Sequence, residues 1–180
     1  MFTLREALAD DASLLARIGE ITFREAYGGM VPDELMEDYV RNYFTASVMQ
    51  LEMDEPSWFF IGEKEGKAMG YIRLAIRKPF VLNIPRIYIL KEVYGSGLAQ
   101  LLLQQAIEIA KEKNCTTIEL SVWKRNPRAI RFYEKSGFQI VGETSFEWDK
   151  DHVDEDWLME RKMEGNHEGT RTRRTTKGRG

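Results

Sequence analysis

The sequence is poor in the residues that stabilise folds through disulfides or metals: its 180 residues include one cysteine, two histidines and five prolines. Cys115 alone forms no intramolecular disulfide, and with only His152 and His167 it does not complete a cysteine-rich zinc site. We therefore expect Cys115 to be a small buried apolar side chain, and we expect no metal.

The sequence also lacks any apolar run near the roughly 18 to 20 residues that span a bilayer. The residues after Met1 do not resemble a basic and then apolar leader. The composition, 43% hydrophobic, 31% charged and 11% aromatic, is typical of a soluble globular domain. We expect one domain over residues 1–164, in the cytoplasm and without a membrane partner.

Charge is distributed unevenly behind the net value of −3. Residues 165–180 carry five basic side chains and one acidic one, a net +4, so the rest of the chain carries −7. The basic segment has no aliphatic or aromatic residue, which predicts disorder. It is either an anion-binding arm or, as we favour, an idle or non-native tail. The acidic body favours cationic partners and argues against nucleic acid.

Apolar periodicity and turn residues predict a mixed α/β sheet. In the first part of the chain we expect a strand at 3–7, a helix capped by Asp10-Asp11 and ended by Gly28-Gly29, a helix opened by Pro32, and a short helix at 46–52. Strands are then expected at 58–63, 68–76 and 84–90, the last with Pro85 near its start.

The second part of the chain alternates strands with helices. We expect a helix at 98–114, a strand at 116–123, a helix capped by Asn126 and ended by Gly137, and closing strands at 138–142, 145–148 and 157–163. Helices placed between strands indicate crossover connections in the central part of the sheet.

Residues 87–99 combine a strand, a glycine-containing turn and the start of an apolar helix. A helix start offers unpaired N–H groups and the positive end of the helix dipole, which together favour a phosphate. The segment lacks the Lys-Ser or Lys-Thr of a P-loop, and Gln100 stands where a dinucleotide-binding motif needs its third glycine. On its own, this segment is weak evidence for a phosphate site, and a plain tight turn into a helix is the favoured explanation.

Residues 126–138 form the second informative segment. Asn126 as a helix N-cap, Phe132 as a core residue and Gly137 as a helix end have sufficient structural explanations. Tyr133 leaves two interpretations open. Its phenol is either a core side chain with a satisfied hydroxyl or a proton donor near the ends of two adjacent strands.

Together, the strand, turn and helix of 87–99 and the pattern Asn-x-x-Ala-x-x-Phe-Tyr-x-x-x-Gly-Phe of 126–138 resemble the GNAT superfamily of acetyl-CoA-dependent N-acetyltransferases, over residues 3–163. Within it, residues 86–89, 106–110, 122–123 and 157–159 resemble the PaiA-type polyamine N-acetyltransferases. The resemblance implies an α/β fold: a mixed, mostly antiparallel twisted sheet of about seven strands, with a splayed central parallel pair and helices on both faces.

The resemblance also implies how acetyl-CoA is held as a cosubstrate. Its pantetheine arm would pair with the open edge of the strand at Ile87, Tyr88 and Ile89. Its pyrophosphate would bind the turn formed by Tyr94, Gly95, Ser96, Gly97, Leu98 and Ala99. The family usually begins this turn with Gln or Arg, so a side-chain contact from Tyr94 to phosphate is not implied.

Two further residues carry implied roles. Asn126 would contact the pantetheine, and Tyr133 would bind near the sulfur and act as general acid. Lys124, Arg125 or Arg131 either pairs with phosphates of the cosubstrate or belongs to the solvated surface.

The implied chemistry is direct acetyl transfer, with backbone N–H groups at Ile89 stabilising the oxyanion and Tyr133 protonating the departing thiolate. Many relatives place a Glu near position 85, where this sequence has Pro85. We therefore expect deprotonation of the amine through water to another carboxylate or to a carbonyl.

The acceptor is expected to enter between the first two helices and the central strands, where acidic residues gather. A small cationic amine such as spermidine or spermine needs such a face, and we predict Tyr27 and Glu34 as substrate-binding residues. A solvated acidic helix surface explains the same residues.

The function expected from the sequence is thus cytoplasmic, acetyl-CoA-dependent acetylation of a polyamine. Acetylation of a protein N-terminus or lysine by the same fold is one alternative, and a non-catalytic CoA-binding regulator is another. The resemblance also leaves room for a homodimer.

Overall fold

The computed structural model describes residues 1–165, and the basic segment expected to be disordered lies, from residue 166 on, outside these described residues. A seven-stranded sheet in the order β1-β2-β3-β4-β5-β7-β6 forms its centre. The strands are β1 (Phe2–Glu6), β2 (Ser57–Lys64), β3 (Lys67–Lys78), β4 (Val81–Ile89), β5 (Thr117–Trp123), β6 (Gln139–Asp149) and β7 (His152–Lys162). The helices are α1 (Ala12–Tyr27), α2 (Asp33–Tyr43), α3 (Ala46–Asp54), α4 (Leu98–Glu112) and α5 (Pro127–Lys135).

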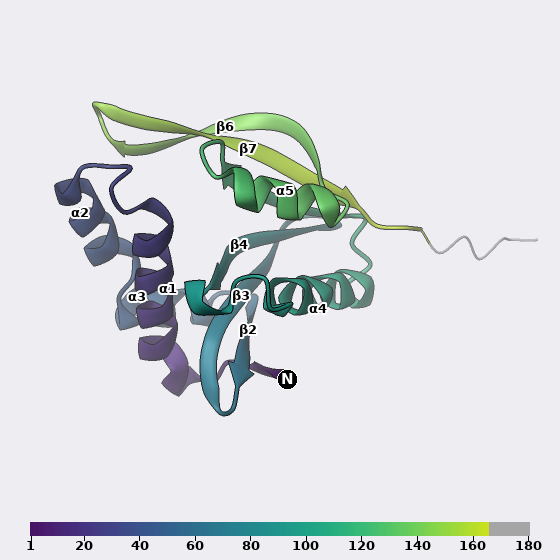
Figure 1. Ribbon diagram of the computed structural model, residues 1–180. Coiled ribbons are helices and arrows are strands. Elements are labelled where there is room, and N and C mark those ends of the chain that lie inside the picture. The colour runs from purple at the N-terminus through teal and green to yellow at the C-terminus, as the bar shows by residue number, and fades with distance from the viewer. Residues whose placement is uncertain (166–180) are drawn as a thin grey trace, which may run out of the picture.

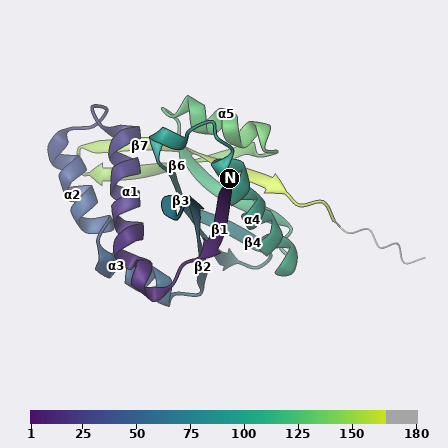
Figure 2. The same ribbon diagram turned by 60° about the horizontal axis from the view of Figure 1, so that its bottom comes forward.

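Helices cover both faces of the sheet. In Figures 1 and 2, α1, α2 and α3 lie together on one side, and α4 and α5 lie on the other. Successive side chains of β4 point to opposite faces of the sheet. Ile87 and Ile89 pack with the α4 side, whereas Tyr88 packs with the α1 side. The architecture expected from the sequence is therefore confirmed, including a predominantly antiparallel sheet with one parallel pair, β4 and β5.

The parallel pair separates partway along its length. Strands β4 and β5 are in register only from Val81–Thr117 to Asn83–Glu119. Beyond Asn83, β4 keeps only its antiparallel partner β3, so its other edge is open. This is the splayed central pair that the resemblance implies.

Pro85 is not near the start of its strand, as expected, but is the fifth of the nine residues of β4. The strand begins three residues earlier than predicted, after a turn in which Phe80 has φ +62°. Pro85 falls where the β3–β4 register shifts and where pairing with β5 has ended. A residue without an N–H is tolerated there because the ladder is already interrupted.

Two other local predictions were wrong. The expected strands 138–142 and 145–148 are one strand, β6, with register shifts against β7, which itself begins five residues earlier than expected, at His152. Asp11 does not cap α1 with its side chain. Its carboxylate instead accepts hydrogen bonds from the Leu8 N–H at 2.7 Å and from the Arg5 guanidinium at 2.7 and 2.8 Å.

A buried ionic cluster fixes β3 and β4 against α3. The guanidinium of Arg86 donates to both oxygens of Glu52 at 2.8 Å and to the Tyr43 carbonyl at 3.2 Å. Arg73 lies 3.4 Å from Glu52 and donates to Glu55 at 2.5 Å. Both arginines are buried, so Glu52 holds two guanidinium groups that water scarcely reaches.

Cys115 is buried, as expected. None of the helices within residues 1–165 is long and apolar enough to cross a membrane.

Candidate functional site

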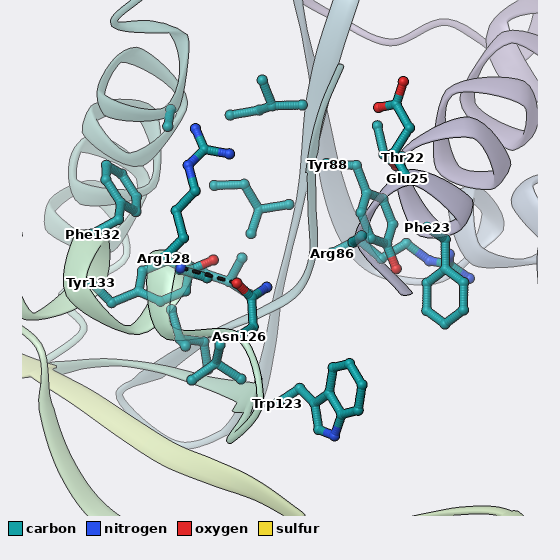
Figure 3. Close-up of a pocket in the computed structure, with 18 of the residues that line it drawn as sticks. Thr22, Phe23, Glu25, Arg86, Tyr88, Trp123, Asn126, Arg128, Phe132 and Tyr133 are labelled. Carbon is teal, nitrogen blue, oxygen red and sulfur yellow. Dashed lines mark hydrogen bonds between the residues drawn. The ribbon is translucent and has the colours of Figure 1, made fainter. Parts of the chain in front are cut away.

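A cavity of about 900 Å³ opens where β4 and β5 separate. Figure 3 shows its two sides: Arg128, Phe132 and Tyr133 come from α5 on one side of β4, and Thr22, Phe23 and Glu25 come from α1 on the other. Strands β5, β6 and β7 supply the remaining wall. The cavity therefore joins the two segments that the sequence singled out.

The turn after β4 presents free main-chain donors at one end of this cavity. Gly95 and Gly97 have φ of +73° and +96°, and a Cβ built on either would meet nothing within 4 Å. Within residues 1–165, their N–H groups donate to no main-chain carbonyl. The first N–H groups of α4 follow directly, so the open space faces donors that suit an anion.

Not every amide of the predicted turn is free. The Tyr94 N–H donates to Lys91 O and the Ser96 N–H donates to Val93 O, which closes the turn itself. Ser96 lies outside the cavity lining, whereas Tyr94, Gly95, Gly97, Leu98 and Ala99 line it.

Basic side chains of α5 flank the same end. The guanidinium carbon of Arg128 lies 3.4 Å from the centre of the Tyr94 ring, and Arg131 and Lys135 also line the cavity. Sequence reasoning proposed Arg131 but missed Arg128 and Lys135.

The other two basic candidates, Lys124 and Arg125, contact neighbouring side chains. Lys124 pairs with Glu143 and Glu155 at 3.1 and 2.8 Å, and the guanidinium of Arg125 lies 4.7 Å from the Trp123 ring centre. Neither lines the cavity described by residues 1–165.

The central part of the cavity is formed by the open edge of β4 and the start of α5. Ile87, Tyr88 and Ile89 all line it. Asn126 is the N-cap of α5 as predicted, because its Oδ1 accepts from the Ala129 N–H at 3.2 Å. The same residue lines the cavity, so its structural role and a ligand contact are compatible.

Tyr133 lines the cavity from α5 and is only 7% exposed. Burial raises the pKa of its phenol above the usual value, and the nearby phenols of Tyr27 and Tyr88 add to the effect. The phenol therefore stays protonated over the physiological pH range and can donate a proton or a hydrogen bond.

The opposite end of the cavity has a wall of aromatic rings, which we call the aromatic wall. Tyr27 contacts Trp123 and Phe23 with ring centres 4.8 and 4.6 Å apart. Tyr39 stacks on Phe23 at 4.5 Å and lies 5.2 Å from Trp148. Its members come from α1, α2, β5 and β6: Phe23, Tyr27, Tyr39, Trp123, Phe146 and Trp148.

Two carboxylates of β7 reach the cavity beside the aromatic wall. Asp154 accepts from the Trp148 indole N–H at 2.7 Å and lies 3.8 Å from Arg125. Asp156 is half-buried; burial raises its carboxyl pKa, and the negative charge of Asp154 raises it further. On the α1 side, Glu25 also lines the cavity and accepts from the Lys91 N–H at 3.1 Å.

The two predicted substrate residues are placed differently. Tyr27 lies in the aromatic wall, where burial raises the pKa of its phenol and the neighbouring Tyr88 and Asp156 contribute further. Glu34 is exposed in the first turn of α2 and lies outside the cavity lining. Its neighbour Glu37 pairs with Arg24 at 2.6 Å, so the α2 carboxylates face away from the cavity or into surface pairs.

Sequence reasoning missed Asp154 and Asp156 because the strand that carries them was predicted to begin five residues too late. Phe146 and Trp148 fall within the predicted strand 145–148 but were not considered as site residues. The signal that could have found them is the spacing of two in Phe146-x-Trp148 and Asp154-x-Asp156, which places each pair on one face of a strand.

The arrangement has a clear polarity. The turn after β4 supplies main-chain donors, and α5 supplies Arg128, Arg131 and Lys135. The aromatic wall, Asp154 and Asp156 come instead from α1, α2, β5, β6 and β7, and the Tyr133 phenol lies in the same cavity. Over the described residues 1–165, no group of three or more His, Cys, Asp or Glu side chains could hold a metal ion. The site suits a ligand with an anionic part and a second ligand with a cationic part.

Comparison with known proteins gives a consistent result. Residues 21–138 match the model of the acetyltransferase (GNAT) family. An uncharacterized N-acetyltransferase of Mycobacterium bovis is 27% identical over 154 residues, covering 85% of this chain and 98% of that protein. An N-alpha-acetyltransferase of Saccharolobus solfataricus is 30% identical over 145 residues, covering 78% and 81%.

Two further similarities are to proteins whose descriptions mention a ligand or a substrate. A probable spermine N(1)-acetyltransferase of Bacillus subtilis subsp. natto is 37% identical over 73 residues, which cover 40% of this chain and 48% of that protein. The crystal structure of PaiA N-acetyltransferase from Thermoplasma acidophilum in complex with coenzyme A has a TM-score of 0.77 and 21% identity. It covers 91% of this chain and 99% of that chain, so the two share a fold over nearly their whole length.

Proposed function

The chain belongs to the acetyltransferase (GNAT) family, and we propose that it transfers the acetyl group of acetyl-CoA directly to a primary amine of a small polycation such as spermidine or spermine. The observation that carries this proposal is the polarity of the cavity. One end matches the phosphates of the cosubstrate, and the other end matches an ammonium group.

The donor end fits acetyl-CoA in three respects. Gly95 and Gly97 leave open space next to unpaired N–H groups, as a pyrophosphate requires. Arg128 and Arg131 supply positive charge beside that space. The unpaired edge of β4 offers main-chain groups to the amides of pantetheine, in the manner of an added strand.

The reaction requires deprotonation of the acceptor amine, stabilisation of the oxyanion and protonation of the departing thiolate. The acceptor ammonium, with a pKa near ~10.4, gives a proton to water in the cavity, and its nitrogen then attacks the thioester carbonyl. Main-chain N–H groups of the open β4 edge at Ile89 stabilise the oxyanion. As the new C–N bond forms, the nitrogen loses its second proton to solvent. As the C–S bond breaks, the Tyr133 hydroxyl protonates the thiolate and regains a proton from solvent, so that one proton is released for each acetyl group transferred.

The acceptor end favours a cation. Aromatic rings attract ammonium groups through their negative faces, and Asp154 and Asp156 add full negative charges. The relative named as a probable spermine N(1)-acetyltransferase supports a polyamine, although the similarity spans under half of each chain. The relative named as an N-alpha-acetyltransferase supports a second candidate, acetylation of a protein N-terminus.

A panel of acceptors separates these candidates. Thiol release from acetyl-CoA should be fastest with spermidine or spermine, and slower with peptides that offer a free N-terminus or a lysine. A peptide that exceeds every polyamine in kcat/KM would replace the proposal with the second candidate. Tight binding of CoA without turnover of any acceptor would instead indicate a regulator.

Substitution of Gly97 tests the donor end. In Gly97→Ala the new methyl group enters the open space at a residue with φ +96°, and we expect the KM for acetyl-CoA to rise about tenfold, which corresponds to about 1.4 kcal/mol. Gly66→Ala is the matched control, because Gly66 has φ +75°, also has nothing within 4 Å of a Cβ, and lies in the β2–β3 turn. Equal KM values in the two variants would contradict the placement of the phosphates.

A further inference from the structure

Asp156 differs from the other carboxylates of β7. It lines the cavity and is half-buried, yet within residues 1–165 neither a cation nor a hydrogen-bond donor offsets its charge. Its neighbour Asp154 is held by Trp148 and Arg125. A half-buried carboxylate without a partner is costly, and such groups in cavities are candidates for ligand binding.

A second polar group at this end also lacks a partner. Trp123, opposite Asp156 in the β5–β7 register, lines the cavity and is 6% exposed. Its indole Nε1–H has no acceptor within the described part of the chain. Because residues opposite each other in a sheet share a face, the Asp156 carboxylate lies beside the Trp123 ring, and a carboxylate next to an aromatic ring suits an ammonium group.

The three groups come from different walls of one cavity. Tyr27 of α1 packs against Trp123 with ring centres 4.8 Å apart, and Trp123 lies opposite Asp156 in the β5–β7 register. Tyr133 lines the same cavity from α5, whereas Asp156 lines it from β7. The Asp156 carboxylate and the phenol assigned to the departing sulfur therefore belong to separate elements of the site.

We propose that Asp156 binds a second, non-reacting ammonium group of the acceptor and so makes the enzyme select amines that carry an additional positive charge a few carbon atoms from the nitrogen that is acetylated. This assignment rests on the proposed function, because it requires an amine acceptor. It names a specificity-determining residue on β7, which the sequence did not single out beside the predicted substrate residues Tyr27 and Glu34.

A pair of acceptors of equal length tests the assignment. With the full chain, the ratio of kcat/KM for 1,4-diaminobutane to that for 1-aminobutane should exceed about tenfold, a difference of about 1.4 kcal/mol. In Asp156→Asn the ratio should approach one, mainly through a higher KM for the diamine. The KM for acetyl-CoA should not change.

Two further variants make the test specific. Glu155→Gln removes one negative charge from the residue that precedes Asp156 on β7. The Glu155 carboxylate pairs with Lys124 outside the cavity, so this variant should keep the wild-type ratio of kcat/KM for the diamine to that for the monoamine. Asp156→Glu keeps the charge and should retain most of the preference even if Asp156→Asn were poorly folded. A diamine preference that survives in folded Asp156→Asn, or that is lost in Asp156→Glu and Glu155→Gln alike, would overturn the assignment.

The activity of the wild-type enzyme distinguishes failure of the Asp156 assignment from failure of the proposed function. If the wild type acetylates no small amine but acetylates a peptide, the proposed function is wrong and the assignment falls with it. If small amines are acetylated and the diamine preference does not depend on Asp156, only the assignment is overturned. A loss of kcat in Asp156→Asn with unchanged KM for the diamine would also overturn it, because such a loss indicates a role in proton transfer.

Discussion

Tyr133→Phe should lower kcat by about 10²- to 10⁴-fold, the range usual for loss of a general acid, while the KM for acetyl-CoA stays within about threefold. The phenol lines the cavity on α5, and its removal leaves the departing thiolate without a protein proton donor. Steady-state rates of thiol release with spermidine measure both constants. The phenylalanine ring fills nearly the same volume, so packing against Phe132 and Phe138 should persist.

Tyr71→Phe is the matched control for this variant. Tyr71 is fully buried on β3 and lies outside the cavity lining, and its hydroxyl donates to the Met49 sulfur at 3.9 Å. Loss of that hydroxyl should leave kcat within about twofold. Equal kcat values for Tyr133→Phe and wild type would remove Tyr133 from the mechanism.

The pH profile gives an independent reading of the same phenol. A general acid must be protonated, and burial raises the pKa of Tyr133 above the usual value of about 10. Ionisation of Tyr133 should therefore cause no loss of kcat below about pH 10. A tyrosine-dependent loss at lower pH, absent in Tyr133→Phe, would contradict this environment.

Glu52→Gln should lower the free energy of unfolding by about 3 to 5 kcal/mol, measured by urea denaturation. The substitution leaves Arg86 and Arg73 buried with reduced compensation, since Arg86 has no other carboxylate partner within residues 1–165. Arg86 lies on β4, whose residues line the cavity, and Arg73 lies on the neighbouring strand β3. Local distortion of these strands should therefore also reduce kcat/KM.

Glu63→Gln is the matched surface control for the Glu52 variant. Glu63 pairs with Arg5 at 2.7 Å, and the Arg5 side chain is 36% exposed. The exposed pair should contribute less than about 1 kcal/mol. A cost for Glu52→Gln no larger than that for Glu63→Gln would show that the buried cluster does not stabilise the sheet.

The parts of the fold that depend on local signals could be predicted. Helix α4 follows from its apolar periodicity, and α5 begins where Asn126 and Pro127 place it, because capping is decided within a few residues. The conformation of the turn predicted to bind phosphate was likewise decided locally, since Gly95 and Gly97 adopt positive φ next to a helix start.

The parts that depend on pairing between distant segments could not be predicted in detail. Pro85 suggested a strand start, whereas its tolerance comes from a register shift and from the separation of β4 and β5. The beginning of β7 was missed because Asp154 and Asp156 face a cavity, where polar residues replace the apolar alternation that marks a strand. Cavity-facing positions break the local pattern because they do not pack into the apolar core.

One of the two predicted substrate residues, Glu34 of α2, lies outside the cavity lining. Acidic residues of α2 at spacing three and four suggested a cation-binding surface, but Glu37 and Asp38 form pairs with Arg24 and Arg41. The role of Glu34 remains a prediction, and its exposed position outside the cavity makes Asp156 the sharper candidate.

The central claim is acetyl transfer to an amine of a small polycation, and mass spectrometry of a competition reaction tests it most directly. Spermidine and a short peptide with a free N-terminus and one lysine are incubated together with acetyl-CoA and the enzyme. We predict that spermidine gains one acetyl group while the peptide stays largely unmodified, and that both remain unmodified with Tyr133→Phe over the same time. Acetylation of the peptide in preference to spermidine would contradict the claim.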